Sequence, residues 1–82
     1  MANEKTDAIY VNGTEEVVDK DKVTYAEVVT FGFPDFPQHP ERIYSVTYKK
    51  GPHEKPEGIL APGASVAIKN GMTFRVTFTG ES

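Results

Sequence analysis

The sequence predicts an α+β fold: a mixed sheet of four or five strands with one short helix packed across one face. Three observations support this prediction. Residues 8–19 have the pattern of a β-hairpin, residues 23–32 contain a detailed helix start, and residues 43–49 and 65–79 alternate apolar with polar side chains. The length of 82 residues leaves room for a single domain, because domains typically hold roughly 100–200 residues.

The composition excludes several classes of protein. The chain has no cysteine, so neither a disulfide framework nor a thiolate metal site is expected. Nine Lys and Arg against twelve Asp and Glu give a net charge of -3, which argues against binding nucleic acid through phosphates. No apolar run reaches the roughly 20 residues of a membrane span, and the polar residues 1–7 do not form a signal peptide. We therefore expect a cytoplasmic protein with a mobile N-terminal arm at residues 1–7.

The first predicted element is a hairpin. Residues 8–11 are rich in β-forming side chains, and Asn12 with Gly13 supplies the two positive-φ positions of a tight turn. Residues 15–19 then return as the second strand.

A helix is predicted after a charged connection at residues 19–22. Thr24 and Glu27 match a capping box, in which the hydroxyl and the carboxylate each accept a free backbone amide. Val23 and Val28 match the hydrophobic staple that accompanies such a cap. Gly32 is expected to end the helix in a left-handed conformation after about two turns. The apolar face consists of Tyr25, Val28 and Val29.

The next segment contains three prolines and cannot continue the helix. We expect residues 33–40 to form a stiff, extended crossing loop, held on the core by Phe33 and Phe36. The alternative is that this loop is a Pro-rich peptide bound by an aromatic groove of a partner.

The remaining segments predict three more strands. In residues 43–49, the side chains of Tyr44, Val46 and Tyr48 share one face, and those of Ile43, Ser45 and Thr47 share the other. Residues 50–58 form a polar turn region, followed by a small apolar anchor at Ile59 and Leu60. Residues 65–68 and 72–79 are expected to form a last hairpin around a turn at residues 69–71. Its buried face consists of Met72, Phe74, Val76 and Phe78.

One topology accommodates these elements economically. A single amphipathic helix cannot bury its apolar face alone, so it must lie across one side of the sheet. The opening hairpin and the final strand then pair around the centre of the sheet, which is the β-grasp architecture. The expected ordered domain spans residues 8–79, with a short C-terminal tail at residues 80–82.

No catalytic, cofactor or metal site is predicted. His39 and His53 lie in Pro-rich loops, and their spacing from Asp35, Glu41 and Glu54 matches no known ligand pattern. The sequence contains neither a phosphate-binding glycine loop nor a nucleophile motif. We therefore expect a protein that is not an enzyme.

Six segments in order resemble the bacterial multiubiquitin family of β-grasp ubiquitin-like proteins. The resemblance covers roughly residues 8–79 and includes a Lys-Pro-Glu-Gly and a Gly-Met-x-Phe piece. The segments are residues 9–13 (IYVNG), 24–29 (TYAEVV), 44–48 (YSVTY), 51–58 (GPHEKPEG), 60–66 (LAPGASV) and 69–77 (KNGMTFRVT).

This resemblance implies a protein modifier. Such domains occur in bacterial operons with an activating enzyme, a conjugating enzyme and a JAB-type peptidase, and many members hold several domains in tandem. Gly80 is then the candidate conjugation or processing site, because ubiquitin-type conjugation adenylates the carboxylate of a terminal glycine. Three residues after the last strand reach only about 10 Å. Either a peptidase exposes Gly80 and the strand end frays, or the usual route is not used.

The open face of the sheet is expected to be polar, unlike the apolar docking patch of ubiquitin. Tyr10 and Ile43 are candidates for a smaller apolar patch, and with Arg75 they form the candidate interaction surface. The face is expected to expose Ser45, Thr47, Thr73, Arg75 and Thr77.

Two other functions compete with the modifier. One is a non-conjugated scaffold that self-assembles into oligomers or filaments through its sheet edges or its N-terminal arm. The other is a sulfur carrier of the same fold, which requires a terminal Gly-Gly that this sequence lacks.

Overall fold

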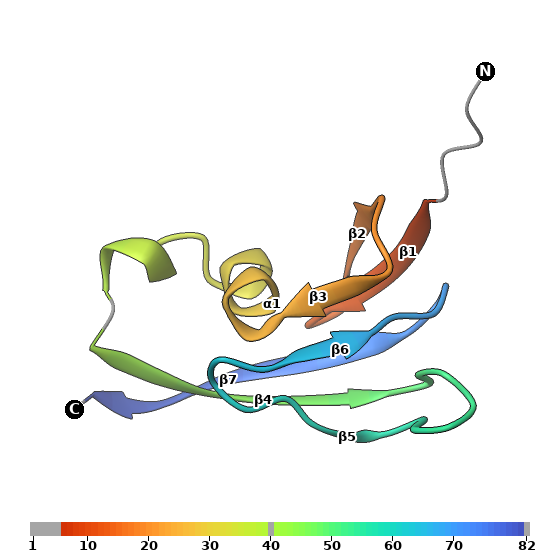
Figure 1. Cartoon of the computed structure of the whole chain (residues 1–82). Coiled ribbons are helices and arrows are strands. Elements are labelled where there is room, and N and C mark those ends of the chain that lie inside the picture. The colour runs from red at the N-terminus through yellow and green to blue at the C-terminus, as the bar shows by residue number, and fades with distance from the viewer. Residues whose placement is uncertain (1–5, 40, 82) are drawn as a thin grey trace.

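A mixed five-stranded sheet forms the base of the fold, and the helix lies across one of its faces (Figure 1). The computed structural model describes residues 6–39 and 41–81. The predicted α+β class and β-grasp architecture are confirmed. The elements are β1 (Asp7–Val11), β2 (Thr14–Val18), β3 (Lys22–Thr24), α1 (Tyr25–Gly32), the 3-10 helix η1 (Phe36–Gln38), β4 (Arg42–Lys49), β5 (Gly58–Ile59), β6 (Ser65–Ala67) and β7 (Thr73–Glu81).

The strand order of the large sheet is β2-β1-β7-β4-β5. β1 and β7 are parallel and the other neighbours are antiparallel, as a β-grasp sheet requires. β3 and β6 form a separate two-stranded sheet that lies, with α1, on the same side of the large sheet (Figure 1).

The opening hairpin is confirmed: β1 begins one residue earlier than predicted and ends where predicted, and β2 lies one residue earlier at both ends. Asn12 and Gly13 have φ values of 53° and 87°, and Val11 pairs with Thr14 across them. These positive φ values explain why Asn followed by Gly occupies the turn. β1 begins at Asp7, the last residue of the expected N-terminal arm, and residues 1–5 of that arm lie outside the described residues.

The capping box is confirmed. The hydroxyl of Thr24 accepts the Glu27 amide at 3.1 Å, and Glu27 Oε1 accepts the Thr24 amide at 2.9 Å. Lys20 Nζ donates to the other carboxylate oxygen of Glu27. The hydrogen bond from Lys20 holds the pKa of Glu27 below its ordinary value, against the opposing effect of partial burial, and the Thr24 amide acts in the same direction as Lys20.

The predicted left-handed end of the helix at Gly32 is wrong. Gly32 is the last helical residue, and the cap is Phe33 at φ −135°, whose amide donates to the Val29 carbonyl at 2.7 Å. Gly32 faces the sheet, where an added Cβ would lie 3.4 Å from the side chains of Val11 and Asn12. A glycine is favoured at position 32 because the helix packs closely on the sheet there, and not because the chain adopts a left-handed conformation.

The predicted last hairpin is also wrong. β6 pairs with β3, with Val66 opposite Val23, whereas β7 pairs with β1 and β4. The turn at residues 69–71 bonds to β1 instead: the Gly71 amide donates to Ala8 O, and Asn70 Oδ1 accepts the Ala8 amide, both at 2.7 Å. The turn therefore transfers the chain from the small sheet to the large one.

The Pro-rich loop is held on the core as predicted, but it is not fully extended. It contains η1, in which Pro37 lies in the first turn, where a missing amide is tolerated. The rings of Phe33 and Phe36 lie 4.8 Å and 5.5 Å from the ring of Tyr44.

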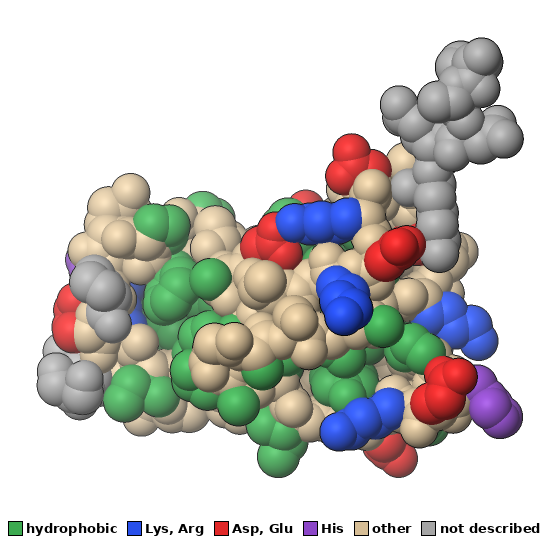
Figure 2. All heavy atoms as spheres, viewed as in Figure 1, with side chains coloured by type: hydrophobic (Ala, Val, Ile, Leu, Met, Phe, Trp, Pro, Cys, Tyr) green, Lys and Arg blue, Asp and Glu red, His purple; other side chains and the backbone are tan. Residues whose placement is uncertain are grey.

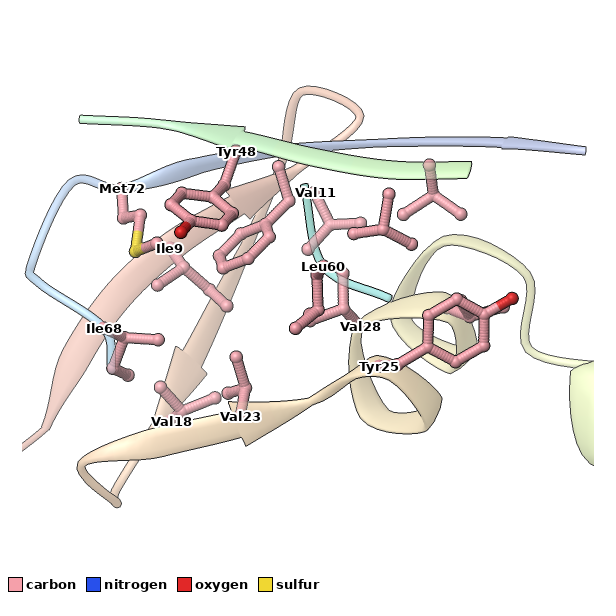
Figure 3. Packing of buried hydrophobic residues seen from close by; sticks show 14 of the residues in the cluster. Ile9, Val11, Val18, Val23, Tyr25, Val28, Tyr48, Leu60, Ile68 and Met72 are labelled. Carbon is pink, nitrogen blue, oxygen red and sulfur yellow. The ribbon is translucent and has the colours of Figure 1, made fainter. Parts of the chain in front are cut away.

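The core lies between the large sheet and the layer of α1, β3 and β6 (Figure 3). All three residues of the predicted helix face are buried, as are alternate residues of β4 and β7. Phe78 is the exception in β7, with 46% of its surface exposed. The buried apolar residues are Ile9, Val11, Val18, Val23, Tyr25, Val28, Val29, Tyr44, Val46, Tyr48, Leu60, Ile68, Met72, Phe74 and Val76.

We predict a pH-dependent contribution of the Lys20–Glu27 pair to stability. Glu27→Gln keeps a capping side chain but removes the charge, and should lower the free energy of unfolding at pH 7 by about 0.5 kcal/mol. Because the pKa of Glu27 is lowered by folding, this stabilisation is present above the unfolded-state pKa and is lost as pH falls through the folded-state pKa. Urea unfolding should therefore show a gap between wild type and variant at pH 7 that closes in acid, once the pH lies below the folded-state pKa of Glu27.

The matched control for this prediction is Glu57→Gln, which removes an exposed carboxylate in the loop before β5. A gap for Glu27→Gln that is equally large at both pH values would show that the pair contributes no charge-dependent stability.

Candidate functional site

In the described part of the chain, α1, β3 and β6 lie on one side of the large sheet, and no helix or strand covers the face opposite α1 (Figure 1). We call it the outer face. Alternation along β4 and β7 places polar side chains here, as predicted. Across the central strands these are Ser45, Thr47, Lys49, Thr73, Arg75 and Thr77.

A groove of about 540 Å³ lies where β1 stops and β7 continues. It is lined by β4, by β7 and by the turn of the opening hairpin. Lys49 and Arg75 are the only charged residues that line it. Lys49 pairs with Thr73 and Arg75 with Thr47, so the two cations are diagonal neighbours on adjacent strands.

Asn12 forms one wall of this groove by completing the hydrogen bonds of β7. Its side-chain Nδ2 donates to Val76 O at 3.1 Å, and its Oδ1 accepts the Val76 amide at 2.8 Å. β1 itself pairs with β7 only at Tyr10 and Val11, so the amide side chain acts as one further residue of parallel strand. The sequence showed Asn12 only as a turn residue.

The Tyr25 side chain provides hydrogen bonds to the backbone of β4 in the same way, on the other side of the sheet. Its hydroxyl accepts the Tyr44 amide at 3.1 Å and donates to the Tyr44 carbonyl at 3.2 Å. β5 pairs with β4 only at Thr47 and Tyr48, so this part of β4 has no strand neighbour on that side.

Tyr10, Ile43 and Arg75 share the outer face, but they do not form one patch. Tyr10 lies level with Thr73 and Ile43 lies level with Gly80, seven positions further along β7. This separates them by roughly 20 Å. The expectation of a joint apolar patch of Tyr10 and Ile43 is therefore wrong. Arg75 lies between them, among the polar side chains of the outer face.

Gly80 lies inside β7 rather than beyond it. The strand continues to Glu81, with Gly80 opposite Ile43 and Thr79 as an extra residue in a β-bulge. Gly80 has φ +158°, a value that side chains disfavour, and the Thr79 hydroxyl donates to Ile43 O at 2.9 Å. Of the expected free tail at residues 80–82, the first two are thus in the sheet, and Ser82 lies outside the described residues.

Aromatic side chains gather beside this end of β7, on the same face as α1. Figure 2 shows hydrophobic atoms between η1 and α1 and over the neighbouring ends of β4 and β7, with a further group on the other half of the molecule, around β6 and β5. Phe78 contacts the ring of Tyr44 edge-on at 5.5 Å, and the Arg42 guanidinium lies 5.9 Å from the Phe78 ring centre. These contacts pack one side of the half-exposed Phe78 ring against the edge of the core.

The His39 ring lies between two carboxylates, and one of these carboxylates also accepts a hydrogen bond from Arg42. Its Nε2 is 3.6 Å from Asp35 Oδ2 and its Nδ1 is 3.6 Å from Glu41 Oε2. The same Asp35 oxygen accepts a hydrogen bond from Arg42 at 3.3 Å. Among the described residues, no group of three or more His, Cys, Asp or Glu side chains is arranged to hold a metal ion.

A family model for multiubiquitin matches residues 8–80, which is nearly the whole chain. The chain belongs to the multiubiquitin family. Comparisons with curated proteins and with solved structures found no match. Ubiquitin-like domains generally act as modifiers and not as enzymes, and this multiubiquitin domain has the corresponding fold. In residues 6–39 and 41–81, no helix has the length and apolar character needed to cross a membrane.

We predict that Asn12 stabilises the multiubiquitin domain through Val76. Asn12→Gly permits the same positive φ but removes both hydrogen bonds, and should lower the free energy of unfolding by about 1–2 kcal/mol. Asn12→Asp should also lose stability, because it retains an acceptor for the Val76 amide but places a carboxylate oxygen against the Val76 carbonyl in place of the amide donor. Guanidinium unfolding measures the difference. If Asn12→Gly has the same free energy of unfolding as the wild type, the two hydrogen bonds between Asn12 and Val76 do not stabilise the pairing of β1 with β7.

Proposed function

We propose that this protein is a ubiquitin-like modifier whose Gly80, after trimming, is joined to a target by dedicated enzymes. The family match over residues 8–80 supports this proposal, because ubiquitin-like domains generally act as modifiers, and Gly80 is the glycine in the last strand. The partners we propose are an activating enzyme, a conjugating enzyme and a JAB-type peptidase, in the cytoplasm of a bacterium. In this proposal the domain itself is not an enzyme.

The proposed chemistry begins with hydrolysis of the peptide bond after Gly80, which consumes one water and leaves a Gly80 carboxylate. The activating enzyme then joins this carboxylate to the α-phosphate of ATP, and pyrophosphate leaves. A nucleophile of the enzyme or target next attacks the acyl carbon, and AMP leaves. The side chains of this domain serve recognition in these steps rather than catalysis.

Access to Gly80 requires the end of β7 to leave β4. The backbone of Gly80 is paired opposite Ile43, and the Thr79 hydroxyl donates a hydrogen bond to the Ile43 carbonyl. A peptidase or an activating enzyme needs an extended segment in its own channel, so we propose that binding separates residues 79–81 from β4. The bulge favours this step, because it interrupts the regular pairing just before Gly80.

The second candidate function is a non-conjugated scaffold that assembles through its sheet edge. β2 is the outermost strand on one side of the sheet, and Val17 in it is 66% exposed. An unpaired strand edge of this kind can pair with another copy. Light scattering on a sizing column separates the two functions, because a strict monomer at high concentration would exclude assembly.

We predict a covalent adduct when the protein is incubated with the activating enzyme of its own operon and ATP. The form ending at Gly80 should gain the mass of AMP or of the enzyme, whereas a matched form ending at Thr79 should not. If a peptidase must first trim the chain, Thr79→Val should be trimmed about 2- to 5-fold faster, because it lacks the hydrogen bond to Ile43. Intact mass spectrometry follows both reactions.

The absence of an adduct from both the full-length and the Gly80-ended protein, with an activating enzyme shown to hydrolyse ATP, would contradict the modifier function. Equal trimming rates for wild type and Thr79→Val would contradict only the proposed separation of β7 from β4.

A further inference from the structure

We propose that the outer-face groove between β4, β7 and the opening turn binds an extended acidic segment of a protein partner. This inference rests on the proposed function, since it names the chemistry by which the domain is recognised. The observations that support it are the charges of the groove, its hydroxyl groups and its shape along a strand.

The groove is cationic although the protein is acidic. Lys49 and Arg75 line it, and no Asp or Glu does. The chain as a whole has twelve acidic and nine basic residues and a net charge of -3. A local surface of the opposite sign selects partners of complementary charge and excludes like-charged ones.

Neither cation has a counter-ion in the described part of the chain. Other basic residues do: Lys20 pairs with Glu27 and Arg42 with Asp35, but no salt bridge involves Lys49 or Arg75. Two like charges at diagonal positions on adjacent strands repel each other. A carboxylate placed between them removes this repulsion, and the Arg75 guanidinium can hold it with two parallel hydrogen bonds.

Threonine hydroxyl groups flank Arg75 in both directions along β7. Thr73 and Thr77 flank Arg75 at alternate positions, and Thr47 lies opposite Arg75 on β4. Alternate residues of a strand repeat at about 7 Å. An extended peptide running along β7 presents its own alternate side chains at the same spacing, so its acidic residues meet Thr73, Arg75 and Thr77 in register.

An acidic polypeptide fits this groove better than a nucleic acid does. Nucleic-acid sites depend on many cations that each neutralise a phosphate, and this groove has two in a protein of net negative charge. The floor also follows the strand: Tyr48, Phe74 and Val76 direct their side chains into the core, so backbone atoms and short hydroxyl side chains remain for an extended ligand.

The test uses a fluorescein-labelled peptide of about six residues that alternates glutamate with serine, which spans the groove along β7. Fluorescence anisotropy should show binding that is tighter than for the glutamine–serine and lysine–serine peptides and that weakens as ionic strength rises from about 0.05 M to about 0.3 M. Arg75→Gln and Lys49→Gln should each raise the Kd about 3- to 10-fold. Thermal unfolding and circular dichroism confirm that both variants fold.

The matched control is Lys22→Gln. This variant removes one positive charge from an exposed position in β3, which belongs to the two-stranded sheet and does not line the groove. An equal loss of affinity for Lys22→Gln would show attraction to net charge alone and would overturn the proposal. Tighter binding of a single-stranded oligonucleotide than of the acidic peptide would also overturn it. So would concentration-dependent dimers that Arg75→Gln abolishes, because the groove would then bind a second copy.

The same variants separate this inference from the proposed function. If Arg75→Gln forms the adduct with the activating enzyme and the wild type does not bind the acidic peptide, the groove proposal fails and the modifier function stands. If the peptide binds and no adduct forms from any version, the modifier function fails and the groove remains a protein-binding site.

Discussion

The parallel pairing of β1 with β7 is the contact on which the rest of this structure depends. It joins the first and last strands at the centre of the sheet, yet it spans only Tyr10 with Thr73 and Val11 with Phe74. β7 has nine residues and β1 has five, so backbone groups of β7 would lack partners beyond the end of β1. The Asn12 amide supplies them at Val76, so one side chain extends the central pairing where the strand stops.

The unequal lengths of these strands also determine where the proposed functional surfaces lie. Because β1 stops early, the hairpin turn ends beside β7 and leaves the groove between the turn, β7 and β4. Because β7 continues, its last residues have a strand neighbour on β4 alone, with Gly80 opposite Ile43. The proposed binding groove and the proposed conjugation site are thus two consequences of one mismatch in strand length, on the two halves of the same strand.

Sequence reasoning succeeded here where the determining interactions are local. The hairpin turn at Asn12, the capping box at Thr24 and the alternation along β4 and β7 depend on neighbours within a few residues. It failed where strands distant in sequence choose partners. The turn at residues 69–71 has the local pattern of a hairpin and closes with a hydrogen bond from Met72 to Lys69, but Asn70 and Gly71 bond to Ala8, which is sixty-two residues from Asn70. The joint patch of Tyr10 and Ile43 failed for the same reason, since only the register of two pairings reveals their separation.

Gly80 shows why residue identity alone does not assign the conjugation site. A glycine at the end of a ubiquitin-like strand suggests an attachment point, but this glycine also follows a bulge residue and has φ +158°. That conformation would favour glycine even in a domain that is never conjugated. Replacing Gly80 would therefore disturb the strand end and the chemistry together. Shortening the chain at Thr79 replaces the C-terminal carboxylate of Gly80 by that of a threonine and places no side chain at the strained position. Loss of the adduct in that form therefore reports on a requirement for the Gly80 carboxylate.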